Sequence, residues 1–309
     1  ALKEKDIKDL KDGCKAEFDY IAASFIRNVD DITEIRKVLD ENGGKNIKII
    51  SKIESQEGID NFDEILEVTD GIMVARGDLG VEIPMEQVPI AQKNFIKKCN
   101  KAGKIVITAT QMLESMTESP RATRAEVSDV ANAVYDVTSA IMLSGESAMG
   151  KYPVICVETM AKIAKAIESD INYGKRLERR EEHCHETFVN YEFYLNHAIC
   201  ETARHMNAKA IFAYTQKGDT PTIISSFMPD CPIIAITGNK RTYTQLALVN
   251  NVTPILVEAS EEPQKMISLG IEKAKEAGYV SEGDVVAIAG GDTILAKEND
   301  EMNRTIGGV

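Results

Sequence analysis

Three charged residues lie at the ends of two apolar segments, and their types and spacing are suited to catalysis. Residues 47–54 (IKIISKIE) predict a strand in which Lys52 and Glu54, two positions apart, share one face. Residues 71–76 (GIMVAR) predict a second strand, and Asp78 follows it in a charged turn. Because ligands bind beyond the carboxyl ends of parallel strands, we expect the lysine and the two carboxylates to meet at one edge of a sheet.

This set of side chains is suited to a hard cation and a developing negative charge. Two carboxylates are ligands for Mg²⁺ (or Mn²⁺), which keeps waters and takes further ligands from its substrate. The ammonium of Lys52 would stabilise an enolate or a transferring phosphoryl group. The alternative is a simple Lys52–Glu54 ion pair on a surface strand, with Asp78 capping a turn. The occurrence of all three at adjacent strand ends favours a site.

The first 170 residues repeat a strand-then-helix pattern five times. Each strand is a nearly continuous apolar run, which is typical of a parallel sheet. The predicted strands are residues 20–25, 47–54, 71–76, 104–109 and 140–143. Asp31 and Glu34 predict a capping box at the start of the first intervening helix. A closed (β/α)8 barrel has eight such units, so the fold predicted here is α/β with a partial TIM barrel of about five units.

A second α/β pattern follows a charged stretch at residues 172–186. Its strands are predicted at residues 208–214, 232–236, 252–257 and 285–289. We therefore predict two domains, residues 1–172 forming part of a barrel and residues 186–309 forming a smaller α/β domain for regulation or oligomerisation.

Composition excludes several classes of protein. The net charge of −13 argues against a nucleic-acid binder. The chain has no apolar run of membrane-spanning length and no leader at its start, so we expect no membrane partner and a cytoplasmic location. Its six cysteines are dispersed, which indicates reduced thiols rather than a disulfide framework. There is no GxxxxGK[ST] phosphate loop and no GxGxxG fingerprint.

Four segments carry a resemblance to a known family. They are SKIES at 51–55, MVARGDLGVEIP at 73–84, TATQMLESM at 108–116 and MLSGESAMGKYP at 142–153. In order and spacing they resemble the pyruvate kinase family, most strongly from about residue 19 to residue 167. The resemblance implies transfer of a phosphoryl group from phosphoenolpyruvate to ADP, which gives pyruvate and ATP, with Mg²⁺ or Mn²⁺ as the metal.

The resemblance also implies roles for particular residues. Lys52 would stabilise charge on the phosphoryl group and the enolate, and Glu54 and Asp78 would bind the metal. The backbone of Gly77 and Asp78 would contact the substrate carboxylate. Thr110 would bind substrate near its methylene carbon and help to deliver the proton that forms pyruvate.

Three further residues are candidates for the same polar network. Arg76 either supports the turn through a salt bridge or acts directly. Ser144 and Glu146 lie at the mouth of the last predicted strand and resemble the family's SGE segment.

In the second domain, the segment from Thr215 to Thr220 lies between a predicted strand and a helix. Related enzymes bind a sugar-phosphate or nucleotide effector here, so Thr215, Lys217, Gly218 and Thr220 are candidate effector ligands. Lys217 and Asp219 depart from the hydroxyl-rich pattern expected of such a loop.

The resemblance places other parts of the family's enzyme upstream of Ala1. These are the first three barrel strands, a lid domain, a phosphate-gripping arginine and the ligands of a monovalent K⁺ ion. We therefore expect a carboxyl-terminal portion of a longer enzyme, usually a homotetramer, that works with the missing N-terminal segment. Two alternatives remain, a catalytically silent metabolite-binding or assembly module, and another Mg²⁺-dependent enolate-forming barrel enzyme acting on phosphoenolpyruvate or pyruvate.

Overall fold

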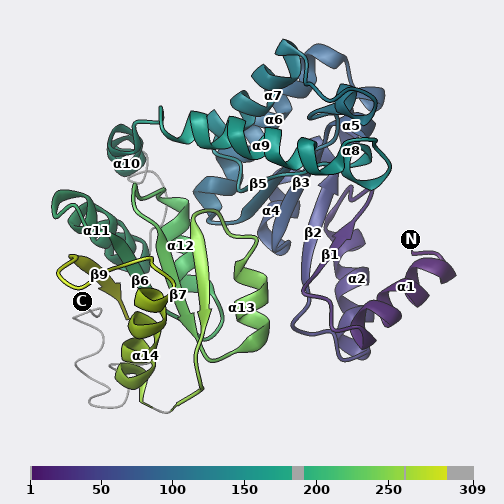
Figure 1. The fold of residues 1–309 in the computed structure, drawn as a ribbon. Coiled ribbons are helices and arrows are strands. Elements are labelled where there is room, and N and C mark those ends of the chain that lie inside the picture. The colour runs from purple at the N-terminus through teal and green to yellow at the C-terminus, as the bar shows by residue number, and fades with distance from the viewer. Residues whose placement is uncertain (1, 183–190, 261, 291–309) are drawn as a thin grey trace. The chain divides into compact units, whose positions relative to one another are not determined.

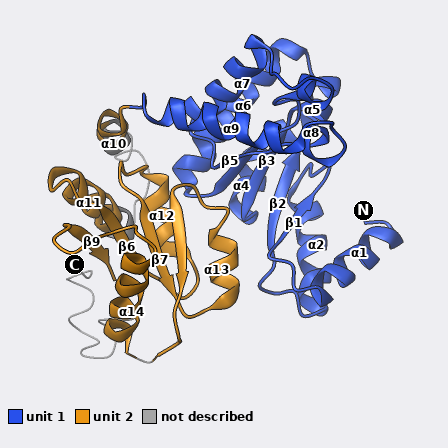
Figure 2. Ribbon diagram, in the orientation of Figure 1, with its two compact units in different colours: residues 1–171 blue, residues 172–309 orange. Residues whose placement is uncertain are grey.

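The computed structural model describes residues 2–182, 191–260 and 262–290. The chain divides into two compact units, residues 1–171 and residues 172–309 (Figure 2). Each unit is built on its own parallel sheet.

The first unit contains a five-stranded sheet whose strands follow one another in chain order, all parallel (Figure 1). The strands are β1 (Tyr20–Ala23), β2 (Lys48–Ile53), β3 (Gly71–Ala75), β4 (Ile105–Ala109) and β5 (Ala140–Ile141). This arrangement confirms the predicted partial barrel. The last strand is shorter than predicted, because only Ala140 and Ile141 pair with β4.

Helices connect these strands and flank them. They are α1 (Glu4–Lys15), α2 (Val29–Glu41), α3 (Gln56–Asp60), α4 (Phe62–Val68), α5 (Arg76–Glu82), α6 (Val88–Ala102), α7 (Arg124–Tyr135), α8 (Gly145–Ala148) and α9 (Pro153–Glu168), with short 3₁₀ turns η1 (Met85–Gln87) and η2 (Glu114–Thr117).

The longest connecting helix before β4 shows how sequence fixes these elements. Pro89 lies in the first turn of α6, where its missing N–H costs nothing. Gly103 ends the helix with φ of 65°, a left-handed conformation that glycine adopts without steric cost. Between them, Phe95 is buried and stacks on Phe62 of α4 with ring centroids 4.2 Å apart. The stacked rings therefore pack α6 against α4.

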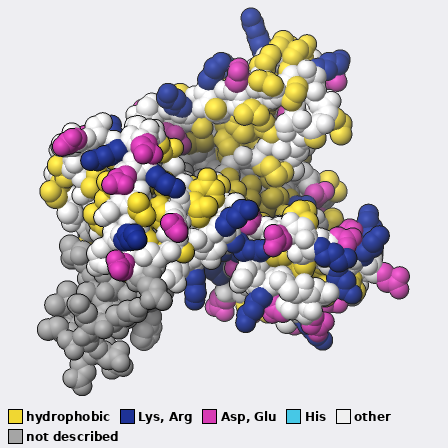
Figure 3. Space-filling view, turned by 60° about the horizontal axis from the view of Figure 1, so that its bottom comes forward, with side chains coloured by type: hydrophobic (Ala, Val, Ile, Leu, Met, Phe, Trp, Pro, Cys, Tyr) yellow, Lys and Arg dark blue, Asp and Glu magenta, His cyan; other side chains and the backbone are white. Residues whose placement is uncertain are grey.

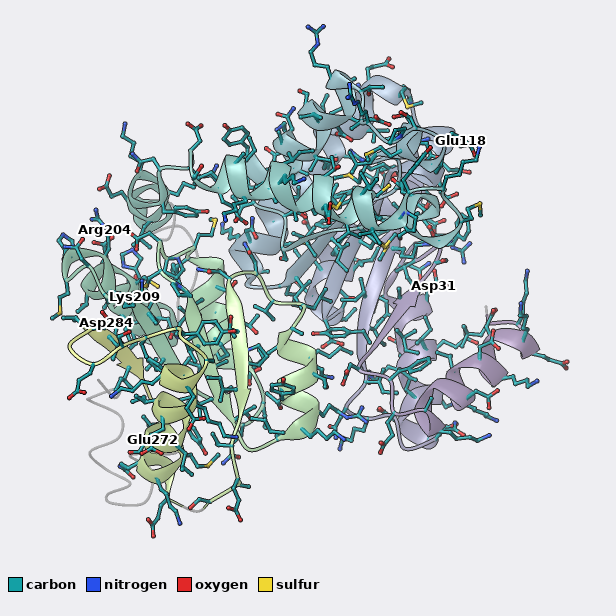
Figure 4. All side chains as sticks on the ribbon, viewed as in Figure 1. Asp31, Glu118, Arg204, Lys209, Glu272 and Asp284 are labelled. Carbon is teal, nitrogen blue, oxygen red and sulfur yellow. The ribbon has the colours of Figure 1, made fainter. Side chains whose placement is uncertain are left out.

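The start of α2 differs from the prediction of a capping box at Asp31 and Glu34. The helix begins at Val29, and Asn28 is its N-cap, accepting a hydrogen bond from the Asp31 backbone N–H. Asp31, labelled in Figure 4, instead accepts hydrogen bonds from the backbone and side chain of Arg27. The prediction was wrong because Asn is as good an N-cap as Asp, and Asn28 lies earlier in the chain.

Buried hydroxyl groups fix the register of the first sheet in two places. The Thr69 hydroxyl bonds with Ser51 Oγ at 2.8 Å and donates toward Ile49 O and Gly71 O at 3.0 Å. The Thr138 hydroxyl contacts Thr108 in the same way between β4 and β5. Each threonine precedes a strand and joins it to the preceding strand.

Replacing Thr69 with valine is expected to lower the free energy of unfolding by about 1–3 kcal/mol, because Ser51 Oγ is left buried with its partner removed. Urea denaturation of the purified chain measures this change. The matched control is Thr33→Val on α2, where the hydroxyl is exposed. Equal effects at the two positions would contradict the register role.

The second unit has a four-stranded parallel sheet in the order β8-β7-β6-β9. Alternate residues of β6 point to opposite faces, so that Ile211 and Ala213 pack into one core and Phe212 into another. Helices α11 and α12 contribute to the first core and α14 to the second. The bounds are α10 (Tyr173–Glu182), α11 (Tyr191–His205), β6 (Ala210–Tyr214), α12 (Asp219–Ser226), β7 (Ile233–Thr237), α13 (Lys240–Leu246), β8 (Val252–Leu256), α14 (Pro263–Glu276) and β9 (Val286–Ala289).

Two further observations concern the helices and the surface charge. Within the described residues, none of the helices has both the length and the apolar character needed to cross a membrane. On the face drawn in Figure 3, acidic and basic side chains are interspersed rather than gathered in an area of one sign.

Candidate active site

The carboxyl ends of the five strands bring polar residues from distant parts of the chain to one edge of the first sheet. Because all five strands are parallel and adjacent, the residues that follow them lie at the same edge. In strand order these residues are Ser24, Glu54, Arg76, Thr110 and Ser144.

Lys52 and Glu54 form an ion pair at the end of β2. Lys52 Nζ lies 2.6 Å from Glu54 Oε1, and it also donates a hydrogen bond of 2.8 Å to Ser24 Oγ. The Glu54 side chain is 1% exposed, whereas that of Lys52 is 21% exposed. The carboxylate is thus held inside the protein, and the ammonium lies between it and solvent.

Two residues that support this pair were not predicted from the sequence. Ser24 accepts the Lys52 hydrogen bond, and the backbone N–H of Phe25 donates to Glu54 Oε2 at 2.5 Å. Phe25 has φ of 55°, a conformation that points its N–H toward β2 at the cost of backbone strain. Nothing in the apolar run YIAASF signals this, since the contact spans 29 residues.

Glu54 and Asp78 are the candidate ligands for a divalent cation at this edge of the sheet. Glu54 Oε1 is buried, and within the described part of the chain the nearby Lys52 ammonium is its only potential donor, so this oxygen could accept a cation. Asp78 lies in the first turn of α5, beyond the end of the neighbouring strand β3, and its side chain is exposed. Among the described residues, no group of three or more His, Cys, Asp or Glu could hold a metal. Two carboxylates with water and substrate oxygens are the kind of ligand set that Mg²⁺ takes.

The segment after β3 is a helix, not the predicted charged turn. Helix α5 begins directly at Arg76 and ends at Glu82. Its first turn lacks a side-chain cap from its own N-cap, Ala75. Instead, the Gly77 N–H donates to Thr110 Oγ1 at 2.8 Å. The prediction of a turn was wrong because a hydroxyl that follows the next strand, that of Thr110, supplies the missing cap.

Thr110 follows β4 in an unusual backbone conformation. Its φ is 66°, and that of Gln111 is 54°. A left-handed conformation is strained for a β-branched residue and is found where surrounding contacts hold it. The Thr110 hydroxyl donates to Ala109 O at 2.6 Å and accepts the Gly77 N–H. The turn therefore holds this hydroxyl between β3 and β4.

Arg76 is buried and reaches the same turn. Its Nε donates to Ala109 O at 3.2 Å, and its Nη2 donates to Thr110 O at 2.6 Å. Nη1 donates to Asp129 Oδ1 at 2.7 Å and lies 3.4 Å from Gln92 Oε1. The side chain supports the neighbouring strand end through both main-chain and ionic contacts.

Glu146 and Ser144 follow β5. The Glu146 carboxylate is fully buried and accepts backbone N–H groups of Leu113 at 3.0 Å and of Ser144 at 2.8 Å. It joins the loop after β4 to the loop after β5. Among the residues that the structure describes, none forms a hydrogen bond with the buried Ser144 Oγ.

The predicted effector residues lie between β6 and α12 in the second unit. Gly218 has φ of 95°, a conformation that requires glycine, and its N–H donates to the buried Thr215 Oγ1 at 2.8 Å. The Lys217 side chain is exposed, and Thr220 is half-buried in the first turn of α12. The hydrogen bond between the Gly218 N–H and Thr215 Oγ1 therefore stabilises the loop internally.

Three of the described cysteines, Cys99, Cys156 and Cys231, have raised thiol pKa values. Burial raises the pKa of Cys99 to about 12 and that of Cys231 to about 11. Burial also raises the pKa of Cys156, with the Glu146 charge adding to the effect. A reactive cysteine needs a lowered pKa, so these thiols are structural.

Family comparisons agree with this arrangement. Residues 1–157 match the model of the pyruvate kinase barrel domain. The chain belongs to the pyruvate kinase family. Residues 195–303 match the model of the pyruvate kinase alpha/beta domain, which corresponds to most of the second unit.

Curated relatives extend the likeness along nearly the whole chain. Pyruvate kinase from Clostridium acetobutylicum is 52% identical over 291 residues, covering 94% of this chain and 61% of the relative. That from Clostridium perfringens is 50% identical with the same coverage. Pyruvate kinase from Sporosarcina psychrophila is 48% identical over 292 residues, covering 94% of this chain and 49% of the relative. The chain thus spans about half to three fifths of the length of these relatives.

Proposed function

We propose that the protein containing this chain transfers the phosphoryl group of phosphoenolpyruvate to ADP, giving pyruvate and ATP. The observation that carries the proposal is the buried Glu54 carboxylate paired with Lys52, on the strand edge that also holds Asp78 and Thr110. Family membership supports the same reaction.

Lys52 and the carboxylates act on the phosphoryl group and the enolate. The Lys52 ammonium is held by Glu54 and Ser24 and faces partly outward, where it can neutralise charge that develops on a transferring phosphoryl group. Glu54 and Asp78 would hold Mg²⁺ or Mn²⁺, which when bound would neutralise phosphate and enolate oxygens. Fixed charges of this kind act without reorganising during the reaction.

Thr110 acts on the carbon that becomes the pyruvate methyl group. Its hydroxyl would bind substrate near the methylene carbon and orient a proton toward it. In the structure this proton is donated to Ala109 O. The Gly77 N–H is engaged by Thr110, so a substrate carboxylate bound at the Gly77–Asp78 backbone would share or replace that bond.

Other features of the family belong to the proposal as well. From family membership we infer that the protein uses K⁺, assembles into a homotetramer and is located in the cytoplasm. Binding of a sugar phosphate or a nucleotide to the loop of Thr215, Lys217, Gly218 and Thr220 is inferred from its place between β6 and α12. The loop's buried hydroxyl and its glycine conformation support a fixed backbone there.

The test is a coupled assay on the full gene product that carries this chain. Phosphoenolpyruvate, ADP and Mg²⁺ are supplied, and pyruvate is followed through lactate dehydrogenase and NADH. We expect pyruvate to form only when ADP is present. Turnover of phosphoenolpyruvate without ADP would favour another enolate-forming enzyme. No turnover, together with metabolite-induced thermal shifts in the second unit, would favour a binding module.

A further inference from the structure

One guanidinium holds both peptide groups that flank the Thr110 Cα. Arg76 Nε donates to the carbonyl before this atom, that of Ala109, and Nη2 donates to the carbonyl after it, that of Thr110 itself. These two peptide planes define the φ and ψ angles of Thr110. The planar guanidinium has its donors in a fixed fork, so its contacts fix the two planes relative to each other.

Two residues on neighbouring helices orient the Arg76 guanidinium. Asp129, on α7, accepts from Arg76 Nη1 at 2.7 Å, and Gln92, on α6, lies 3.4 Å from the same nitrogen. Arg76 is 9% exposed, whereas the Asp129 side chain is 36% exposed. The Arg76 guanidinium is therefore buried, whereas the Asp129 carboxylate that balances its charge is partly exposed. Each of the three guanidinium nitrogens donates a hydrogen bond.

The position of the Thr110 hydroxyl depends on this arrangement. Thr110 has φ of 66°, which a threonine adopts only under constraint. If the turn relaxed, the hydroxyl would move from the Gly77 N–H and from the carboxyl edge of the sheet. A displacement of about 1 Å at a reacting group is enough to lower a rate by about 10²-fold.

We propose that Arg76 and Asp129 together are a positioning pair for Thr110. They act on the hydroxyl through the backbone of its left-handed turn and do not touch the substrate. This inference rests on the proposed function, in which the Thr110 hydroxyl serves protonation of the enolate. It assigns Arg76 to support of the neighbouring strand end rather than to direct catalysis.

The test compares Asp129→Asn and Arg76→Lys with Asp136→Asn in the full gene product. Asp136, at the end of the same helix α7, pairs with Lys93 on α6 and has no role at the turn. We expect Asp129→Asn to lower kcat about tenfold with little change in KM, and Arg76→Lys to lower it at least as much, since lysine has no fork. Asp136→Asn should leave kcat within about twofold.

A double-mutant cycle separates positioning from general destabilisation. If Asp129 acts through Thr110, Asp129→Asn should change kcat less than about twofold in a Thr110→Ala background. Hydrogen exchange of the peptide covering residues 76–82 gives a readout independent of activity. Loss of the Thr110 acceptor should make the Gly77 amide exchange about tenfold faster in Asp129→Asn than in the parent.

Two results would overturn the positioning pair. One is an equal fold-loss from Asp129→Asn in the parent and in Thr110→Ala. The other is exchange at residues 76–82 that matches the parent, which decides the matter even if no turnover is measured. If instead Thr110→Ala retains full activity while exchange at Gly77 rises in Asp129→Asn, the proposed role of Thr110 in catalysis is wrong. Arg76 and Asp129 would then still hold the turn at Thr110.

Discussion

Replacing Lys52 with methionine is expected to lower kcat for pyruvate formation by about 10²- to 10³-fold and to change KM for ADP less than about twofold. The ammonium is placed to stabilise charge that exists only as the phosphoryl group is transferred. Methionine has similar length and no charge, so it removes this stabilisation with little change in packing. Steady-state kinetics of the full gene product, with the coupled assay, measure both constants.

A second consequence of Lys52→Met must be kept apart from the first. The variant also leaves the buried Glu54 carboxylate without its ion pair, and breaking a buried pair from one side is destabilising. Thermal unfolding should therefore accompany the kinetics, with assays kept below the transition. Lys98→Met on α6, which removes an exposed pair with Asp63, is the control and should leave kcat unchanged. A stable, folded Lys52→Met protein with parental kcat would rule out the proposed role.

The fold could be predicted because each strand of the first unit carries its own signal. The apolar runs at residues 71–75 and 105–109 are buried along their whole length, as is typical of strands in a parallel sheet that helices cover on both faces. Local patterns also placed the strands of the second unit within two residues of their observed limits. The pairing of Lys52 with Glu54 depends on alternation along a single strand, which the sequence encodes directly.

The remainder of the site depends on contacts between residues far apart in the chain. Ser24 reaches Lys52 across 28 positions, and Arg76 reaches the Thr110 carbonyl across 34. Such contacts depend on the strand register and on the left-handed backbone conformation of Phe25 and Thr110. Because neither residue is a glycine, the sequence gives no signal of this conformation. Helix α5 was missed for the same reason, because its cap comes from Thr110 and not from its own segment.

Replacing Glu54 with glutamine is expected to raise the Mg²⁺ concentration needed for half-maximal activity at least about tenfold, because one of two proposed carboxylate ligands loses its charge. Glutamine preserves the shape of the side chain, and its amide oxygen can still accept the Phe25 N–H. Titration of activity with Mg²⁺ measures the change. Binding of Mn²⁺ followed by electron paramagnetic resonance gives the same affinity without turnover.

The matched control for this prediction is Glu57→Gln, three residues along the chain. Glu57 is exposed on α3 and accepts a hydrogen bond of 3.4 Å from Asn28, so its charge should not affect the metal. Removal of divalent ions with EDTA should abolish activity of the parent and of Glu57→Gln alike, and added Mg²⁺ should restore both at parental concentrations. If Glu54→Gln binds Mn²⁺ as tightly as the parent, Glu54 is not a ligand. The buried carboxylate would then serve only to hold Lys52, and the metal would have to be bound by Asp78 and the substrate.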